Sequence, residues 1–221
     1  SVDWSAVFAV LAALSMTFGN LVAIRQNNIK RMLGYSTVAH AGYLMVGLAS
    51  VASCGPDADC ILGPSGVLFY LSGYAITNLA AFSAVIAISN RINSDQIDSY
   101  AGMARRAPIL AGVLAFAMIS LIGVPPTVGF MSKTYLFGAA VNTELAWLAV
   151  VGMINSVISA YYYLRVVKVM YLQPPEDDTP VGSGLPMKLA VMVTMLGTAF
   201  FGIYPTPLIN LARSAVDVLV S

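Results

Sequence analysis

Lys133 is the only charged residue in a long apolar run, residues 107–141. It lies seven residues past Pro126 and eight before Val141, too deep for its ammonium to reach water by snorkelling. A charged lysine at the centre of a membrane helix costs roughly 2.5–3.5 kcal/mol, so such residues are usually functional. Removal from water favours the neutral amine, which would let Lys133 take up and release a proton near neutral pH. The chemistry we expect is therefore proton transfer.

His40 is the second buried group that could carry a proton, because imidazole titrates near neutral pH. A histidine that only packs and forms hydrogen bonds is the alternative. Tyr70, Tyr74 and Asn78 recur at i, i+4 and i+8 and would share one face of a helix. Such a stripe could hold a file of waters, or it could join helices by ordinary interhelical hydrogen bonds.

The segment that positions Lys133 contains two adjacent prolines. As one straight helix, residues 107–141 would measure about 50 Å, whereas the hydrocarbon core is roughly 30 Å thick. Pro125 and Pro126 stand in its middle, flanked by Gly123 and Gly129. Each proline removes a backbone donor, so the helix must kink or break there. A helix broken at membrane depth is typical of ion sites in transporters, and a mechanical kink is the alternative.

The composition indicates an all-α polytopic membrane protein. Hydrophobic residues make up 58% of the 221 residues and charged residues 10%, against roughly 25% charged in soluble domains. A soluble core of this size could not bury so much apolar surface. Six runs are long enough to span a bilayer, the fourth of them broken. They are residues 4–24, 35–52, 66–90, 107–141, 145–172 and 189–211.

Several kinds of partner are excluded by the same composition. A net charge of +1 gives no indication of a nucleic-acid partner. One histidine and two cysteines cannot form a dedicated metal cluster, and no Gly-x-Gly-x-x-Gly unit is present to bind NADH. We expect no metal and no cofactor in this chain. Cys54 and Cys60 flank a short polar loop, where a disulfide and two unpaired cysteines are both open.

The basic residues predict the orientation. Nine of the eleven lie near or beyond the ends of the first, third and fifth spans: Arg25, Lys30, Arg31, Arg91, Arg105, Arg106, Arg165, Lys168 and Lys188. The loops after the second and fourth spans contain only acidic charges. The basic side is therefore cytoplasmic, and both ends of the chain face the opposite compartment. No Asp or Glu lies in a predicted span, so a carboxylate partner for Lys133 would have to come from elsewhere.

Two segments on the basic side have simple interpretations. Residues 91–106 mix charged and apolar types and could lie along the membrane interface or form a solvated loop. Tyr161, Tyr162 and Tyr163 fit an interfacial aromatic belt. The chain begins at Ser1 without an initiator methionine, so we expect either a fragment of a longer chain or a processed terminus.

Three stretches resemble the subunit N family of bacterial respiratory complex I, the NADH–quinone oxidoreductase. They are residues 19–43 (GNLVAIRQNNIKRMLGYSTVAHAGY), 123–133 (GVPPTVGFMSK) and 159–165 (SAYYYLR), in the family's order. The first stretch includes Lys30 and Arg31 of the cytoplasmic signature loop. The resemblance covers essentially the whole chain.

The resemblance implies a family of fourteen helices, built partly from two inverted five-helix repeats, each with a broken helix and a buried lysine. Residues 1–172 match the second repeat and residues 185–221 the final helix, within a single membrane domain 1–221. Lys133 matches the lysine of the second broken helix. The missing first repeat would carry a glutamate and further lysines.

The implied function is proton translocation by one subunit of a larger translocase. The other membrane and peripheral subunits would hold NADH, FMN, iron–sulfur clusters and quinone, and this chain would do no redox chemistry itself. The implied location is the bacterial inner membrane, with an organelle inner membrane or a thylakoid as alternatives. Both ends of the segment would then face the periplasmic side.

One departure separates the related families. The larger antiporter-like subunits carry His, His and Lys where this chain has Tyr70, Tyr74 and Asn78, and subunit N usually lacks them as well. This difference argues against the first alternative, a subunit of a multi-subunit sodium/proton antiporter. The second alternative is a structural subunit that no longer conducts, and retention of Lys133 at depth argues against it.

Overall fold

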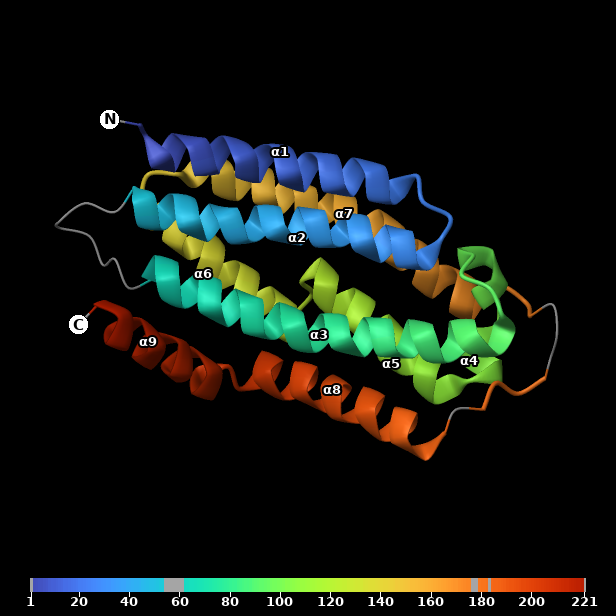
Figure 1. Ribbon diagram of the computed structural model, residues 1–221. Helices are drawn as coiled ribbons and strands as arrows, with labels where there is room; N and C mark the ends of the chain where they lie inside the picture. Colours follow the sequence, from blue (N-terminus) through green and yellow to red (C-terminus); the bar gives the residue numbers. More distant parts are fainter. Residues whose placement is uncertain (1, 54–61, 176–178, 183, 221) are drawn as a thin grey trace.

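The computed structural model describes residues 2–53, 62–175, 179–182 and 184–220, and they form a bundle of helices (Figure 1). The elements are α1 (Trp4–Ile24), α2 (Ile29–Ala52), α3 (Leu62–Ile92), the 3-10 turn η1 (Ile97–Tyr100), α4 (Met103–Arg106), α5 (Pro108–Ile122), α6 (Val128–Asn142), α7 (Ala146–Leu172), α8 (Leu185–Ile203) and α9 (Thr206–Val220). The predicted all-α polytopic fold is confirmed. Within the described residues, α1, α3, α7 and α8 are each long and apolar enough to cross a membrane.

Small residues allow α1 and α2 to pack closely along their length. The buried positions of α1 recur every three or four residues and are mostly small: Ser5, Ala9, Ala12, Met16, Gly19, Asn20 and Ala23. In a bilayer, close approach of helix backbones supplies much of the packing energy, because lipid and side chain are equally apolar. The opposite face of α1 exposes large apolar side chains such as Leu14 and Phe18, as expected for a surface that does not meet water.

The second helix begins at Ile29, six residues before the predicted start of its span. Asn28 provides the cap, since its side chain accepts a hydrogen bond from the amide of Arg31 at 3.0 Å. Lys30 and Arg31 therefore lie in the first helical turn. The helix starts before the predicted span because it extends beyond the apolar run, into residues whose charged side chains can reach water.

The predicted break in the fourth span is confirmed between α5 and α6 (Figure 1). Helix α5 ends at Ile122 and is capped by Gly123, whose φ of +91° lies in the left-handed region that favours glycine. The Pro125–Pro126 peptide is cis. Thr127 precedes α6, and its hydroxyl donates to the carbonyl of Val124 at 2.7 Å. The break is thus an ordered turn between two half-helices.

The last predicted span, residues 189–211, is wrong as a single helix. Helix α8 ends at Ile203, because Pro205 has no N–H to continue the ladder, and α9 begins at Thr206. Helix α9 then runs on beside α3, where Ile209 and Ala212 are buried in one cluster with Phe69. The final segment is therefore a second interrupted helix.

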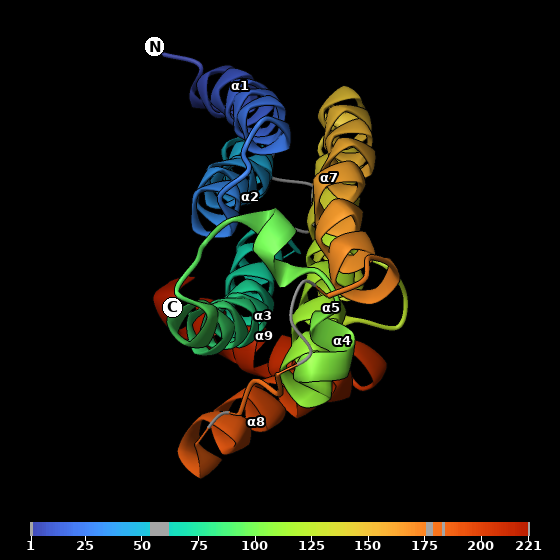
Figure 2. The ribbon, with the colours of Figure 1, turned by 90° about the vertical axis from the view of Figure 1, so that its right-hand side faces the viewer.

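The connection from α3 to α5 folds across the basic end of the bundle (Figure 2). Ile97, Tyr100 and Met103 are almost completely buried there. Residues 91–106 are therefore not a solvated loop, because their apolar side chains close the end of the helix bundle.

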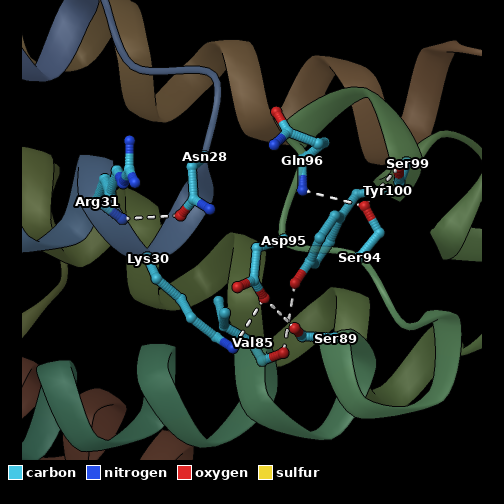
Figure 3. Close-up of polar contacts among 10 residues, drawn as sticks. All are labelled: Asn28, Lys30, Arg31, Val85, Ser89, Ser94, Asp95, Gln96, Ser99 and Tyr100. Atoms are coloured by element: carbon cyan, nitrogen blue, oxygen red, sulfur yellow. Dashed lines mark hydrogen bonds and ion pairs between the residues drawn. The ribbon is translucent and has the colours of Figure 1, made fainter.

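An ion pair fixes this connection to the start of α2 (Figure 3). Lys30 Nζ lies 2.8 Å from Asp95 Oδ1, and Asp95 also accepts from the Ser89 hydroxyl. The hydrogen bond from Lys30, and to a smaller extent that from Ser89, lowers the pKa of the Asp95 carboxyl. Burial raises the pKa of the nearby Tyr100 hydroxyl. The pair is partly exposed and adds little stability by itself, but it defines how the two loops meet.

Candidate functional site

Lys133 lies in the second turn of α6 and is 6% exposed. Its Nζ donates to the carbonyls of Leu121 at 3.1 Å and Ile122 at 2.9 Å, and to the hydroxyl of Ser156 at 3.0 Å. An ammonium has three N–H donors and no acceptor. The protonated side chain is therefore fully hydrogen-bonded inside the protein.

The two carbonyls that Lys133 binds are those that the prolines leave without donors. In a continuous helix, the amides of residues 125 and 126 would bond to the carbonyls of residues 121 and 122. Pro125 and Pro126 have no N–H to give. Lys133 replaces both missing donors, at the carboxyl end of α5 where the backbone dipoles favour a cation. The helix break and the buried lysine thus form one site.

The expectation that Lys133 needs a carboxylate from elsewhere is modified by this geometry. Within the described part of the chain, its polar partners are two carbonyls and a hydroxyl. The ring of Tyr43 adds a cation–π contact, with Nζ 4.7 Å from the ring centroid. Sequence reasoning considered charged partners only and so overlooked the backbone of the preceding half-helix.

His40 is buried in α2 and both of its ring nitrogens face tyrosine hydroxyls. Nδ1 lies 2.6 Å from the Tyr70 hydroxyl, and Nε2 lies 3.4 Å from the Tyr163 hydroxyl. The ring stacks on Tyr74 with centroids 4.6 Å apart. The Tyr163 hydroxyl is bonded in turn to that of Ser36. This row of hydroxyl and imidazole groups can exchange protons, and it also satisfies every polar atom of a packing histidine.

A small cavity lies between His40 and Lys133. Its volume is about 10 Å³, room for a single water. The lining residues are His40, Tyr70, Gly73, Tyr74, Thr77, Ser120, Leu121, Gly129, Ser132 and Lys133. One water in this space could link the tyrosine–histidine row to the lysine.

The predicted stripe on α3 reaches this cavity only in part. Tyr70 and Tyr74 line it, whereas Asn78 is half-buried and is not among the lining residues. Thr77, one position earlier, lines the cavity instead, and its hydroxyl lies 3.4 Å from that of Ser120. The α3 residues that line the cavity are three or four positions apart. A prediction that used four-residue spacing alone therefore included Asn78 in place of Thr77.

The aromatic-belt interpretation of the three tyrosines in α7 holds for only one of them. Tyr161 is 64% exposed, but Tyr162 and Tyr163 are 1% and 0% exposed. Tyr162 donates to Asn20 Oδ1 at 2.8 Å, which joins α7 to α1. A signal was present in the sequence: Asn155, Ser159 and Tyr162 recur at helical spacing and form a polar stripe.

Of the remaining predicted residues that the structure describes, only Gly129 lines the cavity. Lys30 and Arg31 are in the first turn of α2, at the basic end of the bundle. Gly123, Pro125 and Pro126 form the break itself, and of the break residues only Gly129 lines the cavity. Cys54 and Cys60 fall outside the described residues. The described part of the chain contains no group of three His, Cys, Asp or Glu side chains that could hold a metal ion.

The chain is similar to known membrane proteins over its whole length. The family model described as "NADH:quinone oxidoreductase/Mrp antiporter, TM" matches residues 1–159. The NADH-quinone oxidoreductase subunit N of Dehalococcoides mccartyi is 45% identical over 220 residues, which is 100% of this chain and 45% of the relative. The chain spans less than half the length of the curated relatives that it matches.

Solved structures share the fold. A chain of respiratory complex I from Thermus thermophilus with bound aureothin is 28% identical, with a TM-score of 0.75 over 93% of this chain and 45% of that one. A chain of the Mrp complex from Dietzia sp. has a TM-score of 0.85 over 96% of this chain and 46% of that one. Its 22% identity makes it similar in fold alone.

Proposed function

This chain belongs to the NADH:quinone oxidoreductase/Mrp antiporter transmembrane family, and we propose that it translocates protons as part of a subunit N of NADH–quinone oxidoreductase. It is an integral membrane protein. One observation carries the proposal. Lys133 Nζ donates hydrogen bonds to the two carbonyl groups that Pro125 and Pro126 leave without backbone donors. A proton carrier must be stable when charged and must also be able to lose its proton. A buried lysine that is hydrogen-bonded to a broken helix meets both requirements.

In this proposal Lys133 is the proton carrier on one side of the cavity. His40, Tyr70 and Tyr74 form the opposite wall and pass protons to it through one water. Asn78 continues the polar face of α3 beyond the cavity. Residues 1–172 would form one repeat of the subunit, and residues 185–221 its last helical segment.

The energy for translocation would come from partner subunits. NADH, FMN, iron–sulfur clusters and quinone would be bound there, and this chain would contribute to a translocase without redox chemistry of its own. Changes of charge or shape in neighbouring subunits would then alter the proton affinity of Lys133.

The alternative is a subunit of a sodium/proton antiporter, which the fold of the Mrp complex chain also allows. Affinity purification of the tagged full-length subunit distinguishes them. We expect it to bring down a quinone-reducing complex whose proton pumping is independent of sodium. Recovery of antiporter subunits with sodium-dependent proton exchange would contradict the proposal.

We further propose that both ends of the segment face the periplasm of a bacterial cell. The end of α1, the start of α2, the α3–α5 connection, the end of α7 and the start of α8 lie at one end of the bundle, and nine of the eleven basic residues lie in or near these segments. The start of α1 and the end of α9 lie at the other end (Figure 1). A reporter fused at Glu144 should report the periplasm, and one fused at Gln96 the cytoplasm. A reversed signal at either position would contradict this orientation.

A further inference from the structure

Ser156 differs from the other two partners of Lys133 because a hydroxyl can donate as well as accept. The carbonyls of Leu121 and Ile122 can only accept. We propose that Ser156 is a positioning residue that serves both protonation states of Lys133 by reversing the direction of its hydrogen bond. The inference rests on the proposed role of Lys133 as proton carrier.

The printed distances define a complete arrangement for protonated Lys133. Lys133 Nζ donates to Ser156 Oγ at 3.0 Å. Ser156 then donates to the Tyr43 hydroxyl, 3.2 Å away, and Tyr43 donates to the carbonyl of Gly152 at 3.5 Å. Every polar hydrogen in the row has an acceptor.

The reversed arrangement fits neutral Lys133. Loss of one proton turns an ammonium with three N–H bonds into an amine with two N–H bonds and one lone pair. The two N–H bonds remain on Leu121 and Ile122, and the lone pair faces Ser156. The Ser156 hydroxyl turns to donate to Nζ and accepts from Tyr43 in exchange. The released proton passes to the cavity that Lys133 lines, and Ser156 neither gains nor loses one.

Without this hydroxyl, each protonation state has an unmatched group. The ammonium would lose a charge-assisted hydrogen bond, and the neutral amine would bury a lone pair without a donor. Both protonation states of Lys133 would therefore be less stable. The charged state loses more, since hydrogen bonds to ions are about twice as strong. Ser156 is held in place by α7, and its backbone carbonyl accepts from the Ser159 hydroxyl at 2.7 Å.

The test uses the full-length subunit in the assembled complex, with Ser156→Ala and Ser156→Thr compared over a pH series. In Ser156→Ala we expect the alkaline limb of the proton-pumping rate to move to lower pH by about one unit, and the maximal rate to fall. Ser156→Thr retains the hydroxyl and should restore the profile. Thr134→Ala is the control, because it removes an exposed hydroxyl of α6 that donates to the carbonyl of Phe130, and it should leave the profile unchanged.

Tyr43→Phe provides a second variant if Ser156→Ala fails to assemble. This variant keeps the ring over Lys133 but removes the hydroxyl that accepts from Ser156 when Lys133 is protonated. The alkaline limb of the pumping rate should therefore also move to lower pH. A wild-type profile in an assembled Ser156→Ala or Tyr43→Phe complex would overturn the inference. If pumping still depends on Lys133 in that case, the proposed function survives; if pumping never depended on Lys133, the proposed function fails as well.

Discussion

Replacing Lys133 with Ala is expected to reduce proton transfer through this subunit by roughly a hundredfold or more, while the complex still assembles. The loss follows because Lys133 is the only buried lysine among the described residues, and the carbonyls of Leu121 and Ile122 cannot carry a proton. The measurement is substrate-driven acidification of membrane vesicles, normalised to the amount of assembled complex.

Lys168→Ala is the matched control for this experiment. Lys168 is an exposed residue of α7 near the basic end of the bundle, so its loss should leave pumping unchanged. If the Lys133→Ala complex assembles and pumps at the wild-type rate, Lys133 is not the proton carrier.

Replacing Gly129 with Ala is expected to lower stability by about 3 kcal/mol or more, the upper end of the cost of overpacking. A Cβ at this position would lie 1.8 Å from the carbonyl oxygen of Ser120. The amide of Gly129 also donates to the Ser120 hydroxyl at 3.3 Å. The two half-helices must therefore separate, and Lys133 would be moved away from its carbonyl partners.

Gly138→Ala is the control, because it makes the same change in the same helix where a Cβ would meet nothing within 4 Å. The measurement is the amount and thermal stability of the assembled complex. Gly129→Ala should lower both, and Gly138→Ala should match the wild type. Equal stability of the two variants would show that the half-helices do not cross as closely as the structure indicates.

The break could be predicted from the sequence because it follows from a local property. Pro125 and Pro126 lack an N–H wherever they occur, and no tertiary contact can restore it. The orientation stays a prediction from the distribution of the basic residues. The depth of Lys133 followed from its position in an apolar run.

The partners of Lys133 could not be predicted in the same way. Its contact with Leu121 and Ile122 requires that α6 return beside the end of α5, and the direction taken by a turn is a three-dimensional property. Ser156 lies 23 positions away on another helix, so its contact depends on how α6 packs against α7. Tyr163 was misassigned for the same reason, because its position suited an interface until α2 was known to face it.

The end of the chain shows a limit of predicting helices from hydropathy alone. Hydropathy indicated one span through Pro205, because proline does not interrupt an apolar run even though it interrupts hydrogen bonding. The missing N–H that breaks the helix at Pro125 and Pro126 also ends α8 before Pro205. Backbone donors are therefore as informative as hydropathy in such chains.

The central claim is that Lys133 must lose and regain its proton, and Lys133→Arg tests this most directly. Arginine keeps a positive charge and several N–H donors but cannot be deprotonated in a protein. The measurement is the initial rate of proton pumping by the assembled Lys133→Arg complex, beside Lys133→Ala and the wild type. The account predicts that Arg impairs pumping as Ala does. Wild-type pumping with Arg at this position would contradict it, because a fixed charge would then be sufficient.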